Sequence, residues 1–148
     1  MNTVARLPVF DLAPKAFQAL YNLSNTVKKG VLGARLVDLV WLRVSQINGC
    51  AFCMDMHWQD LVKQGASARE LNTVAGWRES PFFTPKERAA LAWAERVAVI
   101  PQGEISDAHY AEAREQLSEA EVAELGFAVA TITAWNLLNV SSCNPVPA

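Results

Sequence analysis

Hydrophobic residues recur three and four positions apart along almost the whole chain, which is the spacing of one face of an α-helix. No stretch shows the alternation of apolar and polar residues, bounded by turn residues, that is typical of paired strands. The pattern therefore predicts an all-α fold of about six to seven helices. The candidate ranges are residues 14 to 28, 34 to 47, 50 to 64, 68 to 76, 85 to 99, 107 to 117 and 119 to 140.

Capping and turn residues separate the predicted helices. A serine or threonine followed three positions later by glutamate is typical of a capping box, in which side chains satisfy the free N–H groups of the first turn. Such pairs are Ser67 with Glu70, Thr84 with Glu87, and Ser118 with Glu121. Helix breaks are expected at Gly30, Asn48-Gly49, Gly65, Ser80-Pro81 and Pro101.

The length of 148 residues fits one domain, residues 1 to 148, with a helical core over about 15 to 140. Hydrophobic residues make up 51% of the chain, and the last helix, VAELGFAVATITAWNLLNV, is apolar on nearly every face. A chain this short buries only part of so much apolar surface by itself. We therefore expect a homo-oligomer; a central core helix in a monomer is the alternative.

Charge and hydropathy argue against several classes of partner. Thirteen basic and fifteen acidic residues give a net charge of -2, and the basic residues are scattered, so we expect no nucleic-acid partner. Nowhere do eighteen apolar residues follow one another, and Asp11 and Pro14 interrupt the N-terminal stretch, so we expect no membrane partner and a cytoplasmic location. No phosphate-binding loop or acidic metal cluster is present, so no cofactor is expected.

The candidate chemistry lies in NGCAFCMDMHWQD, residues 48 to 60, which contains Cys50, Cys53 and His57. On a helix that begins near Cys50, these side chains fall within an arc of about 60°. The free N–H groups of a first turn favour a thiolate, the reactive form of cysteine. His57, one turn after Cys53, can accept its proton. The spacing indicates an activated nucleophile with a neighbouring thiol that can close a disulfide, and leaves Cys143 as a bystander.

This stretch allows other interpretations. A zinc site would need a fourth ligand from Cys143, His109 or Asp38, since no second pair repeats the spacing. Haem attachment would need histidine where Met54 stands. The flanks lack the strand pattern of a thioredoxin-like unit. We predict no metal. Two cysteines that merely fill the core remain an open alternative.

The segment VDLVWLRVSQINGCAFCMDMHWQDLVKQGAS resembles the central motif of the alkyl hydroperoxidase D (AhpD) family, within the carboxymuconolactone decarboxylase-like superfamily. Two later segments, SPFFTPKERAALAWAERVA and AWNLLNV, look like downstream helices of that family. The resemblance covers about residues 15 to 140. It implies a helical protein that assembles as a trimer or hexamer and reduces hydroperoxides through its cysteine pair.

Carried over residue by residue, the resemblance implies that Cys53 attacks the peroxide and becomes a sulfenic acid, which Cys50 resolves as a disulfide. His57 would relay the proton. Asp38 stands twelve residues before Cys50, where the family has glutamate, and would take that role. The rival interpretation makes Asp38 a solvated residue paired with Arg35.

The implied function is a thiol-dependent hydroperoxidase or disulfide reductase. Its partners would be a hydroperoxide substrate and a dithiol reductant of the lipoyl or thioredoxin type. Phe52, between the two cysteines, would make the entrance to the site apolar. The alternatives are a non-catalytic helical binding or assembly protein, and a carboxymuconolactone decarboxylase-type enzyme, a branch that does not depend on a cysteine pair.

Overall fold

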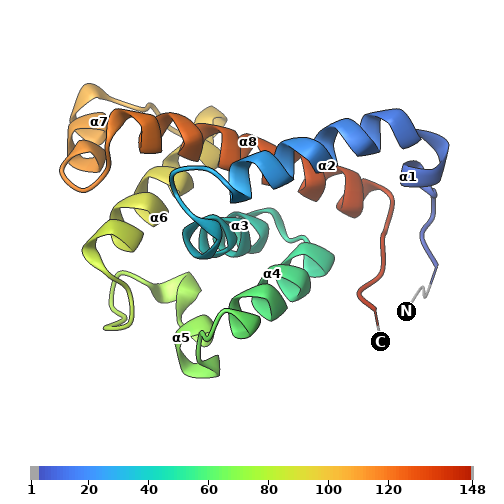
Figure 1. Cartoon of the computed structure of the whole chain (residues 1–148), viewed down its shortest axis with the longest axis horizontal. Coiled ribbons are helices and arrows are strands. Elements are labelled where there is room, and N and C mark those ends of the chain that lie inside the picture. Colours follow the sequence, from blue (N-terminus) through green and yellow to red (C-terminus); the bar gives the residue numbers. More distant parts are fainter. Residues whose placement is uncertain (1–3, 148) are drawn as a thin grey trace.

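The computed structural model describes residues 4–147, and within that range every regular element is helical. The α-helices are α1 (Val9–Leu12), α2 (Pro14–Lys28), α3 (Ala34–Asn48), α4 (Ala51–Lys63), α5 (Ala68–Asn72), α6 (Pro85–Ala98), α7 (Asp107–Arg114) and α8 (Glu119–Ser141) (Figure 1). Two short 3-10 helices, η1 (Val74–Gly76) and η2 (Ile100–Gln102), lie between them. The all-α prediction is confirmed.

Three details differ from the predicted helices. The four-residue α1 was not predicted, and none of its residues is buried, so it lacks the periodic apolar face by which a helix is recognised. The range 68 to 76 is divided at Thr73, whose hydroxyl donates to the carbonyl of Glu70 (2.9 Å). Helix α7 ends at Arg114 rather than 117, and the Arg114 guanidinium donates to the carbonyl of Leu117 (2.6 Å).

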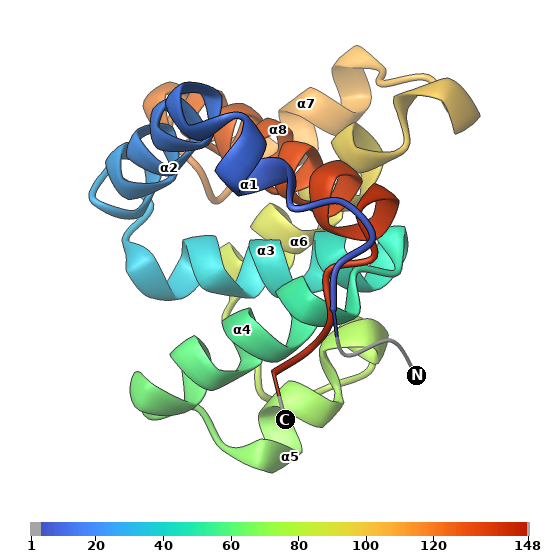
Figure 2. The same ribbon diagram turned by 90° about the vertical axis from the view of Figure 1, so that its right-hand side faces the viewer.

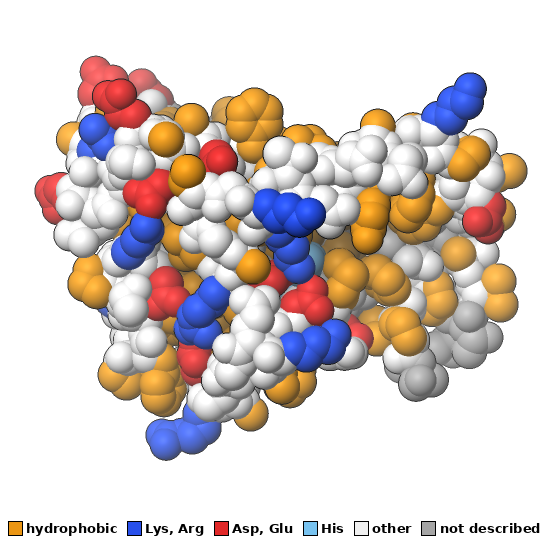
Figure 3. Space-filling view, in the orientation of Figure 1, with side chains coloured by type: hydrophobic (Ala, Val, Ile, Leu, Met, Phe, Trp, Pro, Cys, Tyr) orange, Lys and Arg blue, Asp and Glu red, His pale blue; other side chains and the backbone are white. Residues whose placement is uncertain are grey.

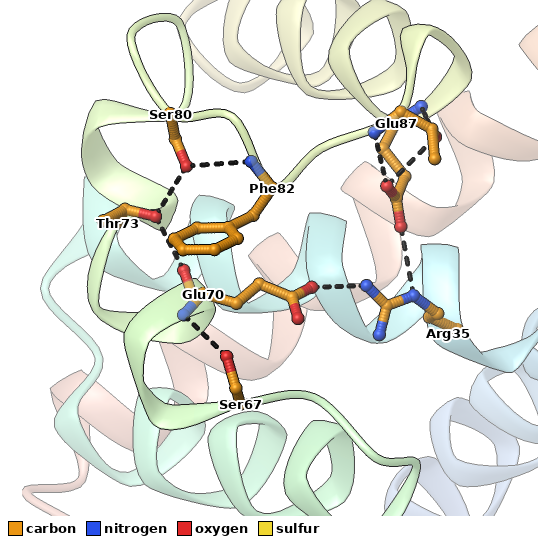
Figure 4. A network of polar contacts seen from close by, with 8 residues as sticks. Arg35, Ser67, Glu70, Thr73, Ser80, Phe82 and Glu87 are labelled. Atoms are coloured by element: carbon orange, nitrogen blue, oxygen red, sulfur yellow. Dashed lines mark hydrogen bonds and ion pairs between the residues drawn. The ribbon is translucent and has the colours of Figure 1, made fainter.

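Two of the three predicted capping boxes are complete, Thr84 with Glu87 and Ser118 with Glu121. Ser67 also accepts the Glu70 N–H, but the Glu70 side chain does not return the bond. It pairs instead with Arg35, which also contacts Glu87 (3.1 Å) (Figure 4). Arg35 thereby ties α3 to the starts of α5 and α6.

Helix α3 occupies the centre of the molecule, and α2, α4, α6 and α8 pack around it (Figures 1 and 2). Its apolar side chains point to several neighbours at once, which is why almost every position in its middle is buried. The buried apolar residues of α3 are Leu36, Val37, Leu39, Val40, Trp41, Leu42 and Val44. The core is therefore built around the helix that precedes the cysteine pair.

Helix α8 crosses over α3 and is buried on one side only. Phe127, Leu137 and Val140 lie on its outer side and are 61%, 67% and 50% exposed. The alternative of a central core helix is therefore wrong for this segment, and an apolar face stays open on the single chain. Within residues 4–147, no helix is both long enough and apolar enough to span a membrane.

The turn between α3 and α4 positions the candidate chemistry. Gly49 adopts a left-handed conformation (φ 68°) that side chains with a Cβ rarely tolerate. The chain reverses there, so α4 packs back along α3, and Cys50 becomes the residue that caps α4. The predicted break at Asn48-Gly49 is confirmed, and it brings the middle of α3 beside the middle of α4.

Candidate active site

Cys50 and Cys53 are joined by a disulfide at the start of α4. Cys50 is the N-cap residue, and its sulfur accepts the backbone N–H of Cys53 (3.3 Å). Both residues are at most 1% exposed. The free N–H groups of a first helical turn favour negative charge, so the start of α4 would stabilise a thiolate when the bond is reduced. The predicted pair is therefore placed for thiol and disulfide chemistry.

His57 and Asp38 form a buried contact one turn along α4 from Cys53. Nδ1 of His57 lies 3.1 Å from Oδ1 of Asp38, and the two residues are 2% and 0% exposed. The rival prediction, a solvated Asp38 paired with Arg35, is wrong. Arg35 points to Glu70 and Glu87, whereas the packing of α3 against α4 buries Asp38 beside the imidazole.

Two further residues hold the Asp38 carboxylate, and the sequence alone did not indicate either. Lys28, at the end of α2, contacts Oδ1 (2.9 Å), and Gln64, just after α4, donates to Oδ2 (2.7 Å). A buried carboxylate is costly unless donors and opposite charge compensate it. Lys28, Gln64 and His57 together supply that compensation from three sides.

Lys28 also contacts Asp60 (3.0 Å), so one ammonium bridges two carboxylates. Burial alone would lower the pKa of Lys28, but the hydrogen bonds and charges of Asp38 and Asp60 raise that pKa above its ordinary value. Burial would raise the pKa of Asp60, yet the hydrogen bonds and charges of Lys28 and Lys63 lower it. The ammonium is therefore held charged beside the site.

The orientation of the His57 ring determines which nitrogen can exchange a proton. Nδ1 faces the Asp38 carboxylate, which can only accept when ionised, so Nδ1 carries the hydrogen in the neutral ring. Nε2 is then the basic nitrogen; it is buried and has no hydrogen-bond partner among the described residues. The Trp41 ring, with its centroid 5.1 Å from the imidazole, supports this orientation.

The same residues were tested as a metal site. Asp38, His57 and Asp60 offer ligand atoms within 4.8 Å of one another. However, the Lys28 ammonium contacts both carboxylates, so a metal ion would have to displace it. His109, considered as a distant zinc ligand, caps α7, where its Nδ1 accepts the N–H of Ser106 (3.2 Å). The donor set therefore favours an internal ion pair over a bound cation.

A pocket of about 620 Å³ opens beside His57, between α2, α4 and α8. Figure 3 shows hydrophobic side chains gathered along the hollow between α2 and α4, next to charged ones. The apolar and aromatic lining residues are Phe10, Phe17, Tyr21, Trp41, Phe52, Met56 and Trp135. We call this space the aromatic pocket. Its volume suits an organic molecule of moderate size, and Phe52 belongs to its wall, as predicted.

A smaller pocket of about 170 Å³ lies on the Cys50 side of the disulfide. Phe52, Asn139 and Asn144 line both pockets, and Cys143 lines only the smaller one. Cys143 is a free thiol of intermediate exposure, so it lies nearer to the disulfide than its predicted role as a bystander implied. Cys50 thus lines the smaller pocket, whereas the aromatic pocket is lined by His57 and by neither cysteine of the disulfide.

Asn139 of α8 contacts the cysteine pair directly. Its Nδ2 lies 3.6 Å from the Cys53 sulfur, and the residue is 4% exposed. The sequence alone did not indicate this residue. The available signal was a polar residue within an otherwise apolar helix, which is also explained by a structural hydrogen bond.

Comparison with known proteins identifies relatives over most of the chain. Residues 14–96 match the model of the Carboxymuconolactone decarboxylase family, and this range contains Asp38, Cys50, Cys53 and His57. An uncharacterized protein of Bacillus subtilis, YdfG, is 30% identical over 139 residues, which cover 94% of this chain and 95% of that protein. Most of the chain, including the cysteine pair, therefore lies within a known sequence family.

Solved structures share the fold. A protein of unknown function from Agrobacterium tumefaciens, described as a putative antioxidant defence protein AhpD, is 34% identical and superposes with a TM-score of 0.93, covering 98% of this chain and 99% of that one. A peroxidase-related protein with an AhpD core from Ralstonia eutropha is 17% identical, with a TM-score of 0.84 over 99% and 94% of the two chains. The second likeness concerns the fold alone.

Proposed function

Because the chain belongs to the carboxymuconolactone decarboxylase family and has the AhpD-like fold, we propose that it is a thiol-dependent peroxidase that reduces organic hydroperoxides. The observation that carries the proposal is the buried Cys50–Cys53 pair at a helix start, with the His57–Asp38 pair one turn away and the aromatic pocket beside it. The proposed base then lines the substrate space, and the proposed nucleophile lies one turn away on the same helix.

In the proposed reaction, His57 Nε2 takes the proton of the Cys53 thiol, and the thiolate attacks the outer oxygen of the hydroperoxide. A sulfur–oxygen bond forms while the oxygen–oxygen bond breaks, so sulfur is oxidised by two electrons and the peroxide is reduced to an alcohol. The proton on His57 passes to the departing alkoxide. The Cys50 thiol then attacks the sulfenic acid, which closes the disulfide and releases water.

Asp38 keeps the His57 ring in the orientation that exposes Nε2, and it stabilises the imidazolium that forms during the first step. Lys28 and Gln64 keep Asp38 itself in place. In this proposal the carboxylate has no contact with the substrate, so it acts through the histidine.

The partners follow from the two pockets and from the family. The aromatic pocket favours a hydroperoxide with an apolar group over hydrogen peroxide. The disulfide needs an external dithiol for each new cycle, of the lipoyl or thioredoxin type, which would also make the protein a disulfide reductase. The exposed apolar face of α8 supports assembly into a trimer or hexamer.

One observation favours a second candidate, a non-catalytic helical protein whose cysteines belong to the core. Both cysteines are almost fully buried, and buried thiols are often inert. This candidate predicts that the reduced thiols react slowly with alkylating reagents and do not respond to peroxide.

Peroxide treatment of the reduced protein separates the two candidates. We expect mass spectrometry to find the Cys50–Cys53 bridge after stoichiometric cumene hydroperoxide. Cys53→Ser should consume no peroxide, whereas Cys50→Ser should complete one turnover and leave a trappable sulfenic acid on Cys53. If both thiols of the wild type remain alkylatable after treatment, the peroxidase proposal is wrong.

A further inference from the structure

Asn139 places an amide against the sulfur that would react. Its Nδ2 is 3.6 Å from Sγ of Cys53, a distance within the range of hydrogen bonds to sulfur. Both residues are buried, so solvent does not compete for this contact. Asn139 comes from α8, whereas Cys53 lies on α4 and its partner Cys50 caps that helix.

The orientation of this amide is determined by its surroundings. Nδ2 also donates to the backbone carbonyl of Trp135 (2.9 Å), which can only accept. Oδ1 accepts the amide of Asn144 (2.7 Å), whose backbone N–H in turn donates to the carbonyl of Asn139 (2.9 Å). Rotating the amide would set its oxygen against the Trp135 carbonyl oxygen, so the N–H side faces Cys53.

We propose that Asn139 is a further catalytic residue, which donates an N–H to the Cys53 sulfur and stabilises the thiolate. The inference rests on the proposed function and adds a residue to it. A neutral thiol or a disulfide sulfur is a weak acceptor, whereas a thiolate is a strong one, so the bond strengthens as charge develops on the sulfur.

This role differs from that of His57. An amide cannot take up a proton near neutral pH, so Asn139 stabilises the negative charge without removing the proton that produces it. The N–H groups at the start of α4 act in the same direction. Asn139 also lines both pockets, so its donor lies where the sulfur, the substrate space and the Cys50 side meet.

The test measures the reactivity of the Cys53 thiol itself. In a Cys50→Ser background, the rate of iodoacetamide modification of Cys53 is followed against pH by mass spectrometry of its peptide. For Asn139→Ala and Asn139→Asp we expect the midpoint to rise by about one pH unit and the rate at pH 7 to fall about tenfold, since a hydrogen bond to a charged group is lost.

The matched control is Asn136→Ala. Asn136 is also a buried amide of α8, but it donates to the Ser45 hydroxyl (3.0 Å) and accepts from Asn48 (3.0 Å). Its removal should lower stability and leave the alkylation midpoint unchanged. Asn144→Ala, which removes the group that orients Asn139 without touching the sulfur, should shift the midpoint in the same direction by less.

The outcomes are distinct. Superimposable pH profiles for the parent and both Asn139 variants overturn the inference, as does an equal shift in Asn136→Ala, which would indicate a general structural effect. If the Asn139 variants fail to fold, Asn144→Ala provides the test: a raised alkylation midpoint supports the inference, and an unchanged midpoint overturns it. Alkylation requires no peroxide, so the two proposals can fail separately. If the wild type reduces no hydroperoxide but the Asn139 variants still shift the alkylation profile, the peroxidase proposal is wrong and the hydrogen-bond role of Asn139 stands.

Discussion

Replacing Asp38 by asparagine keeps the shape of the side chain and removes its charge. The carboxylate accepts from three groups, Lys28, His57 and Gln64. An asparagine has one acceptor oxygen and one NH2 group, so at least one of these donors would face another donor. The most consequential loss is the negative charge beside His57, because a neutral amide no longer stabilises the imidazolium that forms when the ring takes up a proton.

The size of the effect follows from burial. Asp38 is fully buried, and breaking a buried ion pair by removing one partner costs about 3–5 kcal/mol. Lys28 is 27% exposed in its side chain and keeps Asp60, so we expect a decrease near the lower end, about 3 kcal/mol, in the free energy of unfolding. Loss of acid–base assistance should slow peroxide reduction at neutral pH by about tenfold or more.

The assays are urea unfolding of the reduced protein and the pH dependence of Cys53 alkylation and peroxide consumption. Asp60→Asn is the matched control, since it removes the other carboxylate from Lys28 and has no hydrogen bond to His57. We expect the control to lower stability slightly and to leave the rates intact. Equal rates for wild type and Asp38→Asn would refute a role for the Asp38 charge in assisting the histidine, whatever the change in stability.

Three further predictions concern the ion pair, the pocket and the open face of α8. The pKa of Asp60 is lowered in the folded state, so the ionised carboxylate stabilises the fold above the unfolded pKa of about 3.9, and this stabilisation is lost as the pH falls below that value. The difference in free energy of unfolding between wild type and Asp60→Asn, measured by urea titration, should therefore shrink between pH 6 and pH 3. Phe17 lines the aromatic pocket, so Phe17→Ala should raise KM for cumene hydroperoxide severalfold and leave hydrogen peroxide consumption unchanged in steady-state kinetics. A parallel change for both peroxides would contradict the role of the aromatic pocket. Leu137 is 67% exposed in the single chain, so Leu137→Glu would place a charge in the proposed interface and should reduce the oligomer mass measured by light scattering. An unchanged mass would show that this face of α8 is not part of the interface.

Much of the fold was predictable because it depends on local pattern. Helix α2 begins and ends at the predicted residues, and the capping residues Thr84 and Ser118 mark the starts of α6 and α8 as expected. The Gly49 break was predictable because few other residues adopt its conformation. The short α1 was missed because none of its residues is buried, so no periodicity marks it.

The cysteine and histidine stripe was also accessible from the sequence, since Cys50, Cys53 and His57 lie within one helix and its turn, where spacing along the chain determines which side chains share a face. The placement of Asp38 was not. On its own helix it has Arg35 one turn away, and only the packing of α3 against α4 decides that the carboxylate faces His57 while Arg35 faces Glu70 and Glu87.

Two of the remaining parts of the site come from helices that are distant in sequence. Lys28 lies on α2 and Asn139 on α8, and no spacing rule connects them with α4, which Gln64 directly follows. Their contacts depend on how the helices cross, which is set by side-chain packing throughout the core. The amino-acid sequence by itself thus determined which helices form and where the cysteine pair lies at the start of one of them. The tertiary structure alone decided which charges and amides lie around the cysteine pair and His57, because most of these groups are brought there by other helices.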